Sequence, residues 1–376
     1  MIIIFMGLVV FGLVVLQNYV YNRLWDKRLS LGIKFSSKEA FEGDSLYLHE
    51  ELINNKFLPL PWVFVKFNVS RNLVFENTDK IVSADAHYQA DMFSVMMYQN
   101  IKRKMSFVCS KRGYYRLRNV TLACSNLLYN RRFSKTIDNF TELTVFPKLL
   151  DNRDDVNLIY KSLDVTILSN SLINPDPFEF RGIREYQPTD PMRDINFKAT
   201  AVAQQLMVNI HAPTSSKRLE IVLNLEYDRT HPEFELYEQA IRLVATMAER
   251  YISQGVKLGL HTNGKDILTG EDVSVKSGEG ASHMYKIFQA LARVSLSFRV
   301  GHISSYLNDL KDDGDSPVYL IISRYHEKDF MDALEGMKNR GLSTFTIVPV
   351  QKGVDVGFDG KVNVKETDTL RAWEAL

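Results

Sequence analysis

The sequence predicts an α+β protein of several domains: an N-terminal membrane helix, a β-sandwich-like domain and a doubly wound α/β domain. Three observations support this prediction. The chain opens with a long apolar run, residues 29–150 form short alternating segments separated by turn residues, and residues after 215 alternate between strand and helix patterns. A chain of 376 residues is long enough for each soluble domain to have its own core.

Charge and cysteine content exclude two classes of protein. The chain has 46 Lys+Arg against 45 Asp+Glu, so no net field attracts a nucleic acid, and we expect no nucleic-acid partner. The two cysteines, Cys109 and Cys124, are too few for a disulfide-rich scaffold and form no paired zinc motif. We expect them to be buried thiols on strands.

Residues 1–21 are predicted to form a transmembrane anchor. The uncharged run from 1 to 16 would span ~24 Å as a helix, and the following QNYVY brings it to about 31 Å, close to the ~30 Å hydrocarbon core. Tyr19 and Tyr21 would then lie at the membrane interface. A signal peptide would place basic residues before the apolar run and a small-residue cleavage site after it, and neither is present.

The basic residues near this segment predict its orientation. Arg23, Lys27 and Arg28 follow the apolar run, and no Lys or Arg precedes it. Basic residues stay on the cytoplasmic side of a membrane helix, so we expect the soluble domains to face the cytoplasm.

Residues 29–150 are predicted to form the β-sandwich-like domain. LSLGIKF alternates apolar and other side chains, SLYLHEEL follows a Gly-Asp turn, and PLPWVFVKFNV is a nearly continuous apolar strand. MSFVCSKRGYYRLRNVTLAC favours two strands joined near Arg112-Gly113, and ELTVFP closes the domain. Strands at this spacing are typical of an antiparallel sandwich.

Residues 151–214 are predicted to form a linker that carries the most unusual stretch, FRGIREYQPTDPMRDINFKATA. Thr189-Asp190-Pro191 is a helix-start signal, so PMRDINFKATA is predicted to be one short helix with Arg193 and Phe197 on the same face. Arginine and aspartate side chains are mixed here without a histidine or cysteine. We therefore favour a latch or docking surface over an acid–base site or a nucleic-acid clamp.

Residues 215–376 are predicted to form the α/β domain. LEIVLNL, VKLGLHT, PVYLIIS and STFTIVPV are typical of buried strands. Between them lie three helical stripes of apolar residues: Tyr237, Ile241, Val244, Ala248 and Tyr251; then Met284, Ile287, Phe288, Leu291 and Val294; then Phe330, Leu334 and Met337. Alternating strands and helices predict a mostly parallel sheet.

The unusual stretch resembles the signature of the bacterial "domain of unknown function 58" family, G-x-R-x-Y-x-x-G-D-x-x-R-x-I-x-W-x-x-x-A. The matching residues are Gly182, Arg184, Tyr186, Asp190, Arg193, Ile195 and Ala201. Three positions depart from it: Thr189 replaces a glycine, Phe197 the tryptophan and Val202 an arginine. KRGYYRLRNVTL and TVFPKL are similar to two further elements of that family.

The resemblance implies a plan for nearly the whole chain: a membrane segment, a β-sandwich-like region, the signature and a von Willebrand factor A-like α/β domain. The family usually has a two-helix membrane hairpin, whereas this chain shows one apolar segment. The resemblance also implies a partner, a MoxR-type AAA+ ATPase, and a place in the bacterial inner membrane. We therefore expect a non-enzymatic, membrane-anchored adaptor for complex assembly or envelope maintenance.

Such domains, where they bind magnesium, use D-x-S-x-S after the first strand. Here the stretch reads Asn224-Leu225-Glu226-Tyr227-Asp228, and Arg324 follows the strand where an acidic residue is usual. Oxygen atoms of Asn224, Glu226 and Asp228 could still hold a hard cation, but the nearby arginine argues against it. We predict a protein-interaction loop with exposed Tyr227 and Arg324, and no metal, cofactor or catalytic residue.

Two alternatives remain open. A metal-dependent adhesion module of von Willebrand A type would need a cation at this loop. An uncharacterised hydrolase would need a nucleophile, and no G-x-S-x-G, Walker loop, G-x-G-x-x-G or H-E-x-x-H motif is present.

Overall fold

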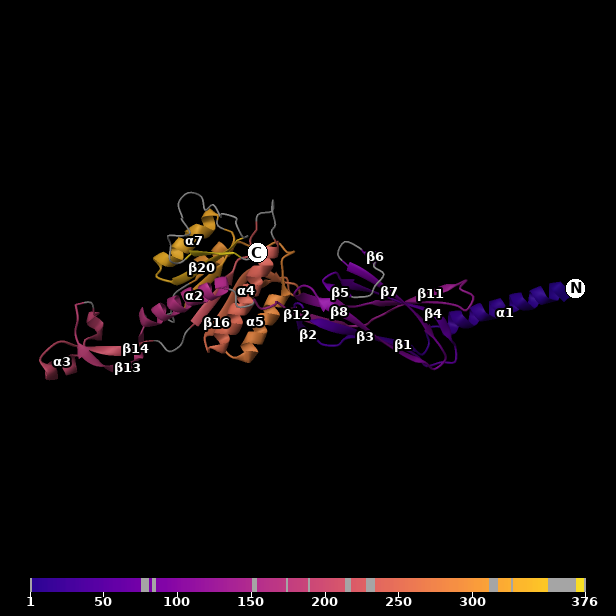
Figure 1. The fold of residues 1–376 in the computed structure, drawn as a ribbon, viewed down its shortest axis with the longest axis horizontal. Helices are drawn as coiled ribbons and strands as arrows, with labels where there is room; N and C mark the ends of the chain where they lie inside the picture. The colour runs from indigo at the N-terminus through magenta and orange to yellow at the C-terminus, as the bar shows by residue number, and fades with distance from the viewer. Residues whose placement is uncertain are drawn as a thin grey trace. The chain divides into compact units, whose positions relative to one another are not determined.

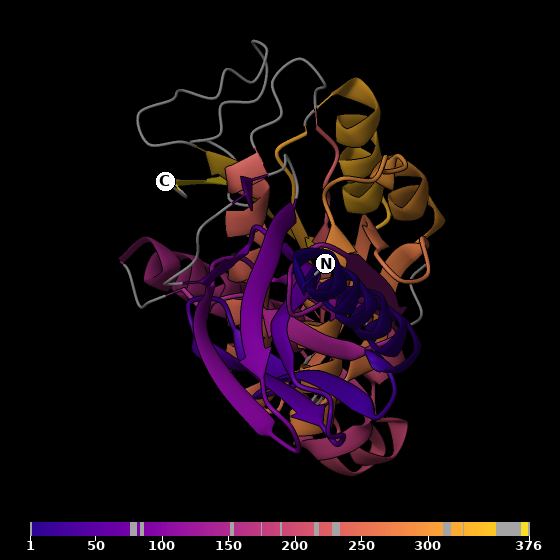
Figure 2. The same cartoon turned by 90° about the vertical axis from the view of Figure 1, so that its right-hand side faces the viewer.

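The fold is described from a computed structural model of the full chain (Figures 1 and 2). The chain divides into two compact units, Met1–Lys148 and Leu149–Leu376. The structure describes residues 2–75, 81–82, 86–150, 154–173, 175–188, 190–213, 218–227, 234–310, 317–325, 327–350 and 370–374.

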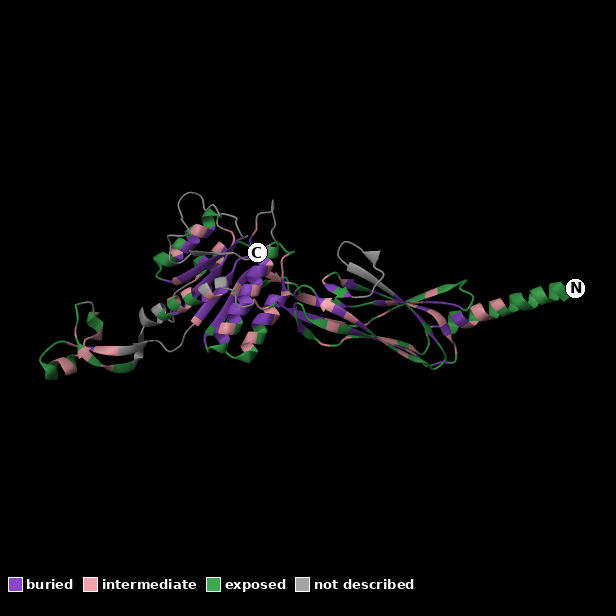
Figure 3. Cartoon of the chain, in the orientation of Figure 1, coloured by how far each residue is buried: buried purple, intermediate pink, exposed green. Residues whose placement is uncertain are grey.

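The first unit begins with helix α1, Ile2–Leu24, whose side chains are exposed along most of its length (Figure 3). Its length and composition suffice to cross a membrane. It is the one helix of that kind among the described residues. The predicted apolar helix is therefore present, and it is three residues longer at its end than the predicted segment 1–21.

The end of α1 is fixed to the β-domain by specific contacts. The Tyr21 hydroxyl donates to the Pro59 carbonyl at 2.8 Å, and the Trp25 ring stacks on Phe133 at 6.0 Å between centroids. The buried Lys56 ammonium donates to the carbonyls of Trp25 and Lys27, in the segment that follows α1, at 2.7 and 2.8 Å. Burial lowers the pKa of Lys56 to about 8. The Tyr21 ring is buried in the protein, so it is not available to contact lipid, and its depth relative to a membrane stays a prediction.

Three sheets make up the rest of the first unit. The strands are β1 (Leu29–Phe35), β2 (Glu39–Phe41), β3 (Ser45–Asn54), β4 (Leu60–Ser70), β5 (Leu73–Phe75), β6 (Ile81–Val82), β7 (Ala86–Val95), β8 (Asn100–Cys109), β9 (Gly113–Leu117), β10 (Val120–Ser125), β11 (Arg132–Ile137) and β12 (Thr141–Phe146). Their orders are β1-β3-β8-β5, β11-β10-β4-β7-β6 and β2-β12-β9. The sequence predicted two strands within residues 105–124, and the structure has parts of three, β8, β9 and β10. The additional break is a turn between β9 and β10, in which Asn119 has a left-handed backbone conformation.

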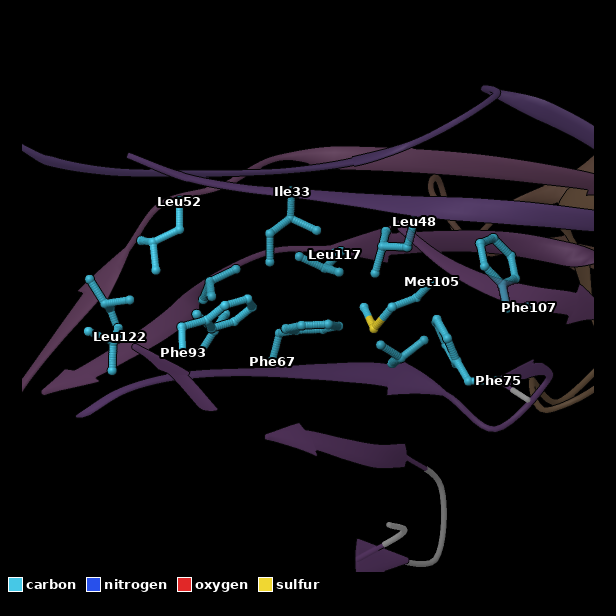
Figure 4. Close-up of a cluster of buried hydrophobic side chains, with 14 of the residues drawn as sticks. Ile33, Leu48, Leu52, Phe67, Phe75, Phe93, Met105, Phe107, Leu117 and Leu122 are labelled. Atoms are coloured by element: carbon cyan, nitrogen blue, oxygen red, sulfur yellow. The ribbon is translucent and has the colours of Figure 1, made fainter. Parts of the chain in front are cut away.

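Alternating residues of these strands form one core between the sheets. Figure 4 shows Ile33, Leu48 and Leu52 on one side and Phe67, Phe93 and Leu122 on the other. Cys109 and Cys124 are free and buried, and burial raises the pKa of each thiol to about 12, which keeps both protonated.

Among the acidic side chains that face this core, Glu50 lacks a hydrogen bond. Glu50 lies on β3 between the inward-facing Leu48 and Leu52, and it is 2% exposed. Neither of its carboxyl oxygens has a hydrogen-bond partner among the described residues. Burial, and then the charge of Asp91, raises the pKa of Glu50 to about 7, although Arg103 opposes the shift. Arg103 is the register partner of Glu50 and forms an ion pair with Asp91 at 2.7 Å.

The second unit contains a seven-stranded sheet. Helix α2 (Asp154–Ile173) precedes strands β13 (Pro175–Glu185) and β14 (Met207–Pro213), which form a separate pair. The sheet contains β15 (Arg218–Leu223), β16 (Lys257–Asp266), β17 (Asp272–Gly278), β18 (Val294–Ser295), β19 (Val318–Ile322), β20 (Ser343–Val350) and β21 (Leu370–Glu374). Its order is β17-β16-β15-β19-β20-β21, with β18 beside β16. All pairs are parallel except those of β17 and β18.

Helices α4 (Phe234–Ser253), α5 (Ala281–Arg293), α6 (Ile303–Asp309) and α7 (Lys328–Asn339) connect these strands. Val222 and Ile321 face the cluster formed by α6 and α7. Successive strand residues point to opposite faces, so Ile221 and Leu223, which are also fully buried, face the other side. Both faces of the sheet are therefore covered, as the alternating pattern predicts.

Replacing Glu50 with glutamine is expected to remove a pH dependence of stability. The folded chain keeps the Glu50 proton up to about pH 7, whereas the unfolded chain releases it near pH 4.5, so the free energy of unfolding falls as pH rises through this range. The free energy of unfolding of the wild type should fall by about 3 kcal/mol between pH 4.5 and about pH 7. Glu50→Gln has no carboxyl group at this position, so this decrease should be absent from its pH profile.

Denaturant unfolding followed by tryptophan fluorescence measures this difference, because Trp25 and Trp62 report on the first unit. Glu51→Gln is the matched control, since Glu51 is the next residue of β3 and its side chain is 43% exposed. Identical pH profiles for the wild type and Glu50→Gln would contradict the assignment.

Candidate functional site

The signature segment, residues 175–213, forms a separate two-stranded hairpin. Strands β13 and β14 pair antiparallel, with Gly182 opposite Ile210 and Arg184 opposite Val208. Neither strand pairs with the seven-stranded sheet within the part of the chain described. Tyr186 continues the pairing beyond β13, because its N–H donates to the Leu206 carbonyl at 2.9 Å.

A bidentate ion pair between Arg184 and Asp190 closes the loop of this hairpin. Nη1 and Nη2 of Arg184 donate to Oδ2 and Oδ1 of Asp190, each at 2.6 Å, and the Gln187 N–H also donates to Oδ2 at 2.8 Å. These hydrogen bonds lower the pKa of Asp190 and raise that of Arg184. The pair is bidentate, an arrangement that fixes the orientation of both side chains as well as pairing their charges. Both partners belong to the signature segment, so this latch fixes the segment itself.

The helix predicted from Pro191 is broken in two. A 3₁₀ turn covers Met192–Asp194, Ile195 pairs with Val208 in an extended conformation, and α3 covers Phe197–Ala203. Asn196 causes the break because its side chain caps α3 by accepting from the Ala199 N–H at 2.9 Å. Arg193 and Phe197 therefore do not share a helical face. Arg193 is exposed, and its ion pair among the described residues is with its neighbour Asp194, at 3.8 Å.

Apolar side chains of this segment are exposed. Met192 and Phe197 are each 77% exposed and Val202 is 83% exposed. Further exposed apolar side chains in the same segment are Phe180, Ile183 and Leu206. Large apolar residues are usually buried, so several exposed ones in one short segment make it a candidate interaction surface.

The predicted interaction loop lies at the carboxyl ends of β15, β16 and β19 and is built around Asn224. The Asn224 amide donates to the Ser323 hydroxyl at 3.0 Å, and its carbonyl oxygen accepts from the Glu226 N–H at 3.0 Å and from the Asn263 amide at 2.8 Å. Asn263 also accepts from the Leu225 N–H at 2.9 Å. These side chains are buried.

Glu226 closes the network on the side of α6. Its carboxylate accepts from the Ile303 N–H at 3.3 Å and lies 2.7 Å from Nδ1 of His302. Burial raises the pKa of Glu226, while its hydrogen bonds oppose that shift. The Tyr237 hydroxyl donates to the Glu226 carbonyl at 2.7 Å.

The residues predicted to be exposed at this loop are partly buried. The Tyr227 ring packs edge-on against Phe234 and Tyr237, at 5.7 and 6.2 Å between centroids. Arg324 is half-buried beside Asn224. The prediction of two exposed contact residues is therefore wrong, and Asp228 lies outside the described residues.

The donor set at this edge does not fit a divalent cation. The side-chain groups of Asn224 bond within the protein, and the Ser323 hydroxyl donates to the Tyr325 carbonyl at 2.7 Å. A cation would need these oxygens to leave their partners, and only Glu226 supplies a carboxylate among the described loop residues. The described residues contain no group of three or more His, Cys, Asp or Glu suited to a metal ion.

Sequence reasoning missed Asn263 and His302, which come from elements distant in the chain. Asn263 follows the buried part of β16 just as Asn224 follows β15, and the parallel pairing of these strands could have connected them. It also missed a group formed by Ser274, His261 and Glu220. The Ser274 hydroxyl lies 2.9 Å from Nδ1 of His261, but Nε2 is 3.6 Å from Glu220, too far for the hydrogen bond of a catalytic relay.

No protein-family model matches this chain, and no curated protein matches it. Solved structures with partial similarity include a non-cellulosomal cohesin from Archaeoglobus fulgidus (12% identity, TM-score 0.22, 31% of this chain and 91% of the cohesin). The CARDB domain of a Pyrococcus furiosus protein (9%, 0.22, 32% and 90%) and a type I cohesin of Pseudobacteroides cellulosolvens (14%, 0.22, 33% and 96%) are similar to the same extent. Likeness at this level supports no conclusion on function.

Replacing Asn224 with alanine is expected to destabilise the second unit by roughly 2–4 kcal/mol, because it leaves the buried Asn263 amide, the Ser323 hydroxyl and the Glu226 N–H short of a partner. Thermal unfolding of the purified protein measures the loss. Asn308→Ala, at an exposed position of α6, is the control and should leave the melting temperature unchanged.

Millimolar Mg²⁺ or Ca²⁺ is expected to leave the melting temperature of the wild type unchanged, since the oxygens at the Asn224 loop are already hydrogen-bonded. A stabilisation that disappears in the Asn224→Ala variant would show that a cation does bind there.

Proposed function

We propose that this protein is a non-enzymatic, membrane-anchored adaptor that docks its partner through the signature segment, residues 175–213. The observation that carries the proposal is the exposure of Met192, Phe197 and Val202 on a hairpin held in shape by the Arg184–Asp190 latch. Pre-organised apolar side chains bind a partner with little loss of conformational entropy. The apolar helix α1 supports attachment to a membrane.

The resemblance of the signature to the "domain of unknown function 58" family suggests the partner, a MoxR-type AAA+ ATPase, and a role in complex assembly or envelope maintenance. The basic residues after the apolar helix favour a cytoplasmic position for both soluble units, as an ATPase partner requires. The bacterial inner membrane is the compartment that fits these features. The von Willebrand factor A-like assignment of the second unit belongs to this proposal and is supported by its mostly parallel, doubly covered sheet.

The two alternatives have weaker support. A metal-dependent adhesion module would need free oxygens at the Asn224 loop, and those oxygens are engaged within the protein. A hydrolase would need an activated nucleophile, and the spacing between His261 and Glu220 leaves Ser274 without a hydrogen-bonded relay.

A photoreactive amino acid at position 197 is expected to crosslink an AAA+ ATPase in intact cells, identified by mass spectrometry of the membrane fraction. The same amino acid at position 335, an exposed site on α7, is the control and should not. Met192→Ser should weaken the crosslink from position 197, because it removes neighbouring apolar contact area. Capture of an envelope protein with no ATPase would contradict both the partner and the predicted orientation.

Asp190→Asn is expected to reduce the same crosslink without unfolding the second unit, because it removes the charge from the latch while keeping its size. Circular dichroism and the melting temperature check the fold. An unchanged crosslink in this variant would show that the latch does not organise the docking surface.

A further inference from the structure

Three loops of the first unit gather around the end of helix α1, where the helix leaves the β-domain (Figure 1). They are residues 55–59 between β3 and β4, residues 96–99 between β7 and β8, and residues 126–131 between β10 and β11. We call them the helix-end loops. The first accepts a hydrogen bond from the Tyr21 hydroxyl at its Pro59 carbonyl, at 2.8 Å. The third donates one from its Asn126 amide to the side-chain oxygen of Asn18, at 2.6 Å.

The remaining loop, residues 96–99, is joined to the first loop rather than to the helix. The Tyr98 N–H donates to the Lys56 carbonyl at 3.2 Å. The Asn54 amide donates to the carbonyls of both Leu58 and Met96, at 2.9 and 2.8 Å. The three loops therefore form one continuous surface at the end of the sandwich from which α1 emerges.

This surface is rich in exposed apolar and aromatic side chains. Each loop contributes at least one of them: Phe57 from the first, Met96, Met97 and Tyr98 from the second, and Leu127, Leu128 and Tyr129 from the third. Phe57 is 73% exposed. Large apolar side chains gathered at one end of a domain indicate a surface that something other than water covers.

The charges at this end are mostly positive. The helix-end loops contain no aspartate or glutamate, and the third loop ends in the exposed Arg131. Lys27 and Arg28, in the segment that follows α1, are also exposed. Asp26 lies in that segment too, and Lys135 pairs with it at 2.9 Å. Cations next to exposed apolar and aromatic side chains favour the interface of a bilayer that contains anionic phospholipid.

We propose that the helix-end loops rest on the interfacial region of a phospholipid bilayer that α1 crosses. This contact rests on the proposed membrane attachment of α1 and adds a second point at which the protein meets lipid. The part of α1 before Asn18 is apolar and mostly exposed, so it fits the hydrocarbon core. The loops bonded to Asn18 and Tyr21 then lie at the boundary of that core, the zone that aromatic side chains prefer. Lipid surrounds α1 at this level, so it covers the loops without any further partner.

Fluorescence quenching tests this contact in the full-length protein. The protein is reconstituted into vesicles of phosphatidylcholine and phosphatidylglycerol that carry a nitroxide near the top of the acyl chain. A thiol-reactive fluorophore is attached in turn to Leu128→Cys, to Leu13→Cys on α1 and to Lys38→Cys, an exposed site between β1 and β2 at the far end of β1 from α1. Cys109 and Cys124 are buried, and labelling of the wild type measures their background.

The labels at positions 128 and 13 are expected to be quenched about twofold or more relative to the label at 38, because both lie in contact with lipid. Quenching at 13 without quenching at 128 would overturn the lipid contact and leave the membrane anchor intact. Absence of quenching at 13 would contradict the anchor itself. Protection of position 128 from aqueous iodide without quenching by lipid would show that protein, such as a second copy of this chain, covers the loops instead.

Variants separate a lipid contact from simple tethering by α1. Phe57→Ser combined with Leu127→Ser should reduce the quenching at position 128 with an unchanged melting temperature, because both side chains are exposed. Phe140→Ser is the matched control, since Phe140 is also an exposed phenylalanine, in the loop between β11 and β12 at the other end of β11. Undiminished quenching in the double variant would show that the apolar side chains do not hold the loops on the bilayer.

Discussion

The hydrogen bonds of the Asn224 side chain are the constraint on which the second unit depends. One carboxamide ties the ends of three parallel strands: to Ser323 after β19, to Asn263 on β16 and to the Glu226 N–H on its own loop. An amide can do this because it both donates and accepts, whereas a carboxylate could only accept. The carboxyl edge of the sheet, where α/β domains usually bind ligands, is thereby closed by the protein itself.

Because the polar groups at this edge are engaged within the protein, other surfaces of the same unit are better suited to bind a partner. The signature segment presents exposed apolar side chains, and the bidentate pair of Arg184 and Asp190 holds its loop in one conformation.

In the first unit, a buried lysine joins the apolar helix to the sandwich. The Lys56 ammonium donates to the backbone carbonyls of Trp25 and Lys27, in the segment that connects α1 to β1. Together with Tyr21 and Phe133 it makes α1 continuous with the β-domain. A helix held in this way fixes the orientation of the first unit relative to any membrane that the helix crosses.

The sequence by itself determined the elements whose signals are local. Periodicity predicted the apolar helix, the strands of the first unit, and the alternating strands and helices of the second, because burial of one face imposes its period on the chain. It failed where a local competition decided the outcome: Asn196 starts α3 and so breaks the helix predicted from Pro191. Only the tertiary structure brought Asn263 and His302 to the Asn224 loop, buried Tyr21, partly buried Tyr227, and placed His261 beside Ser274 and Glu220. These residues come from different strands and helices, and the register of a parallel sheet, which no local pattern encodes, decides which of them meet.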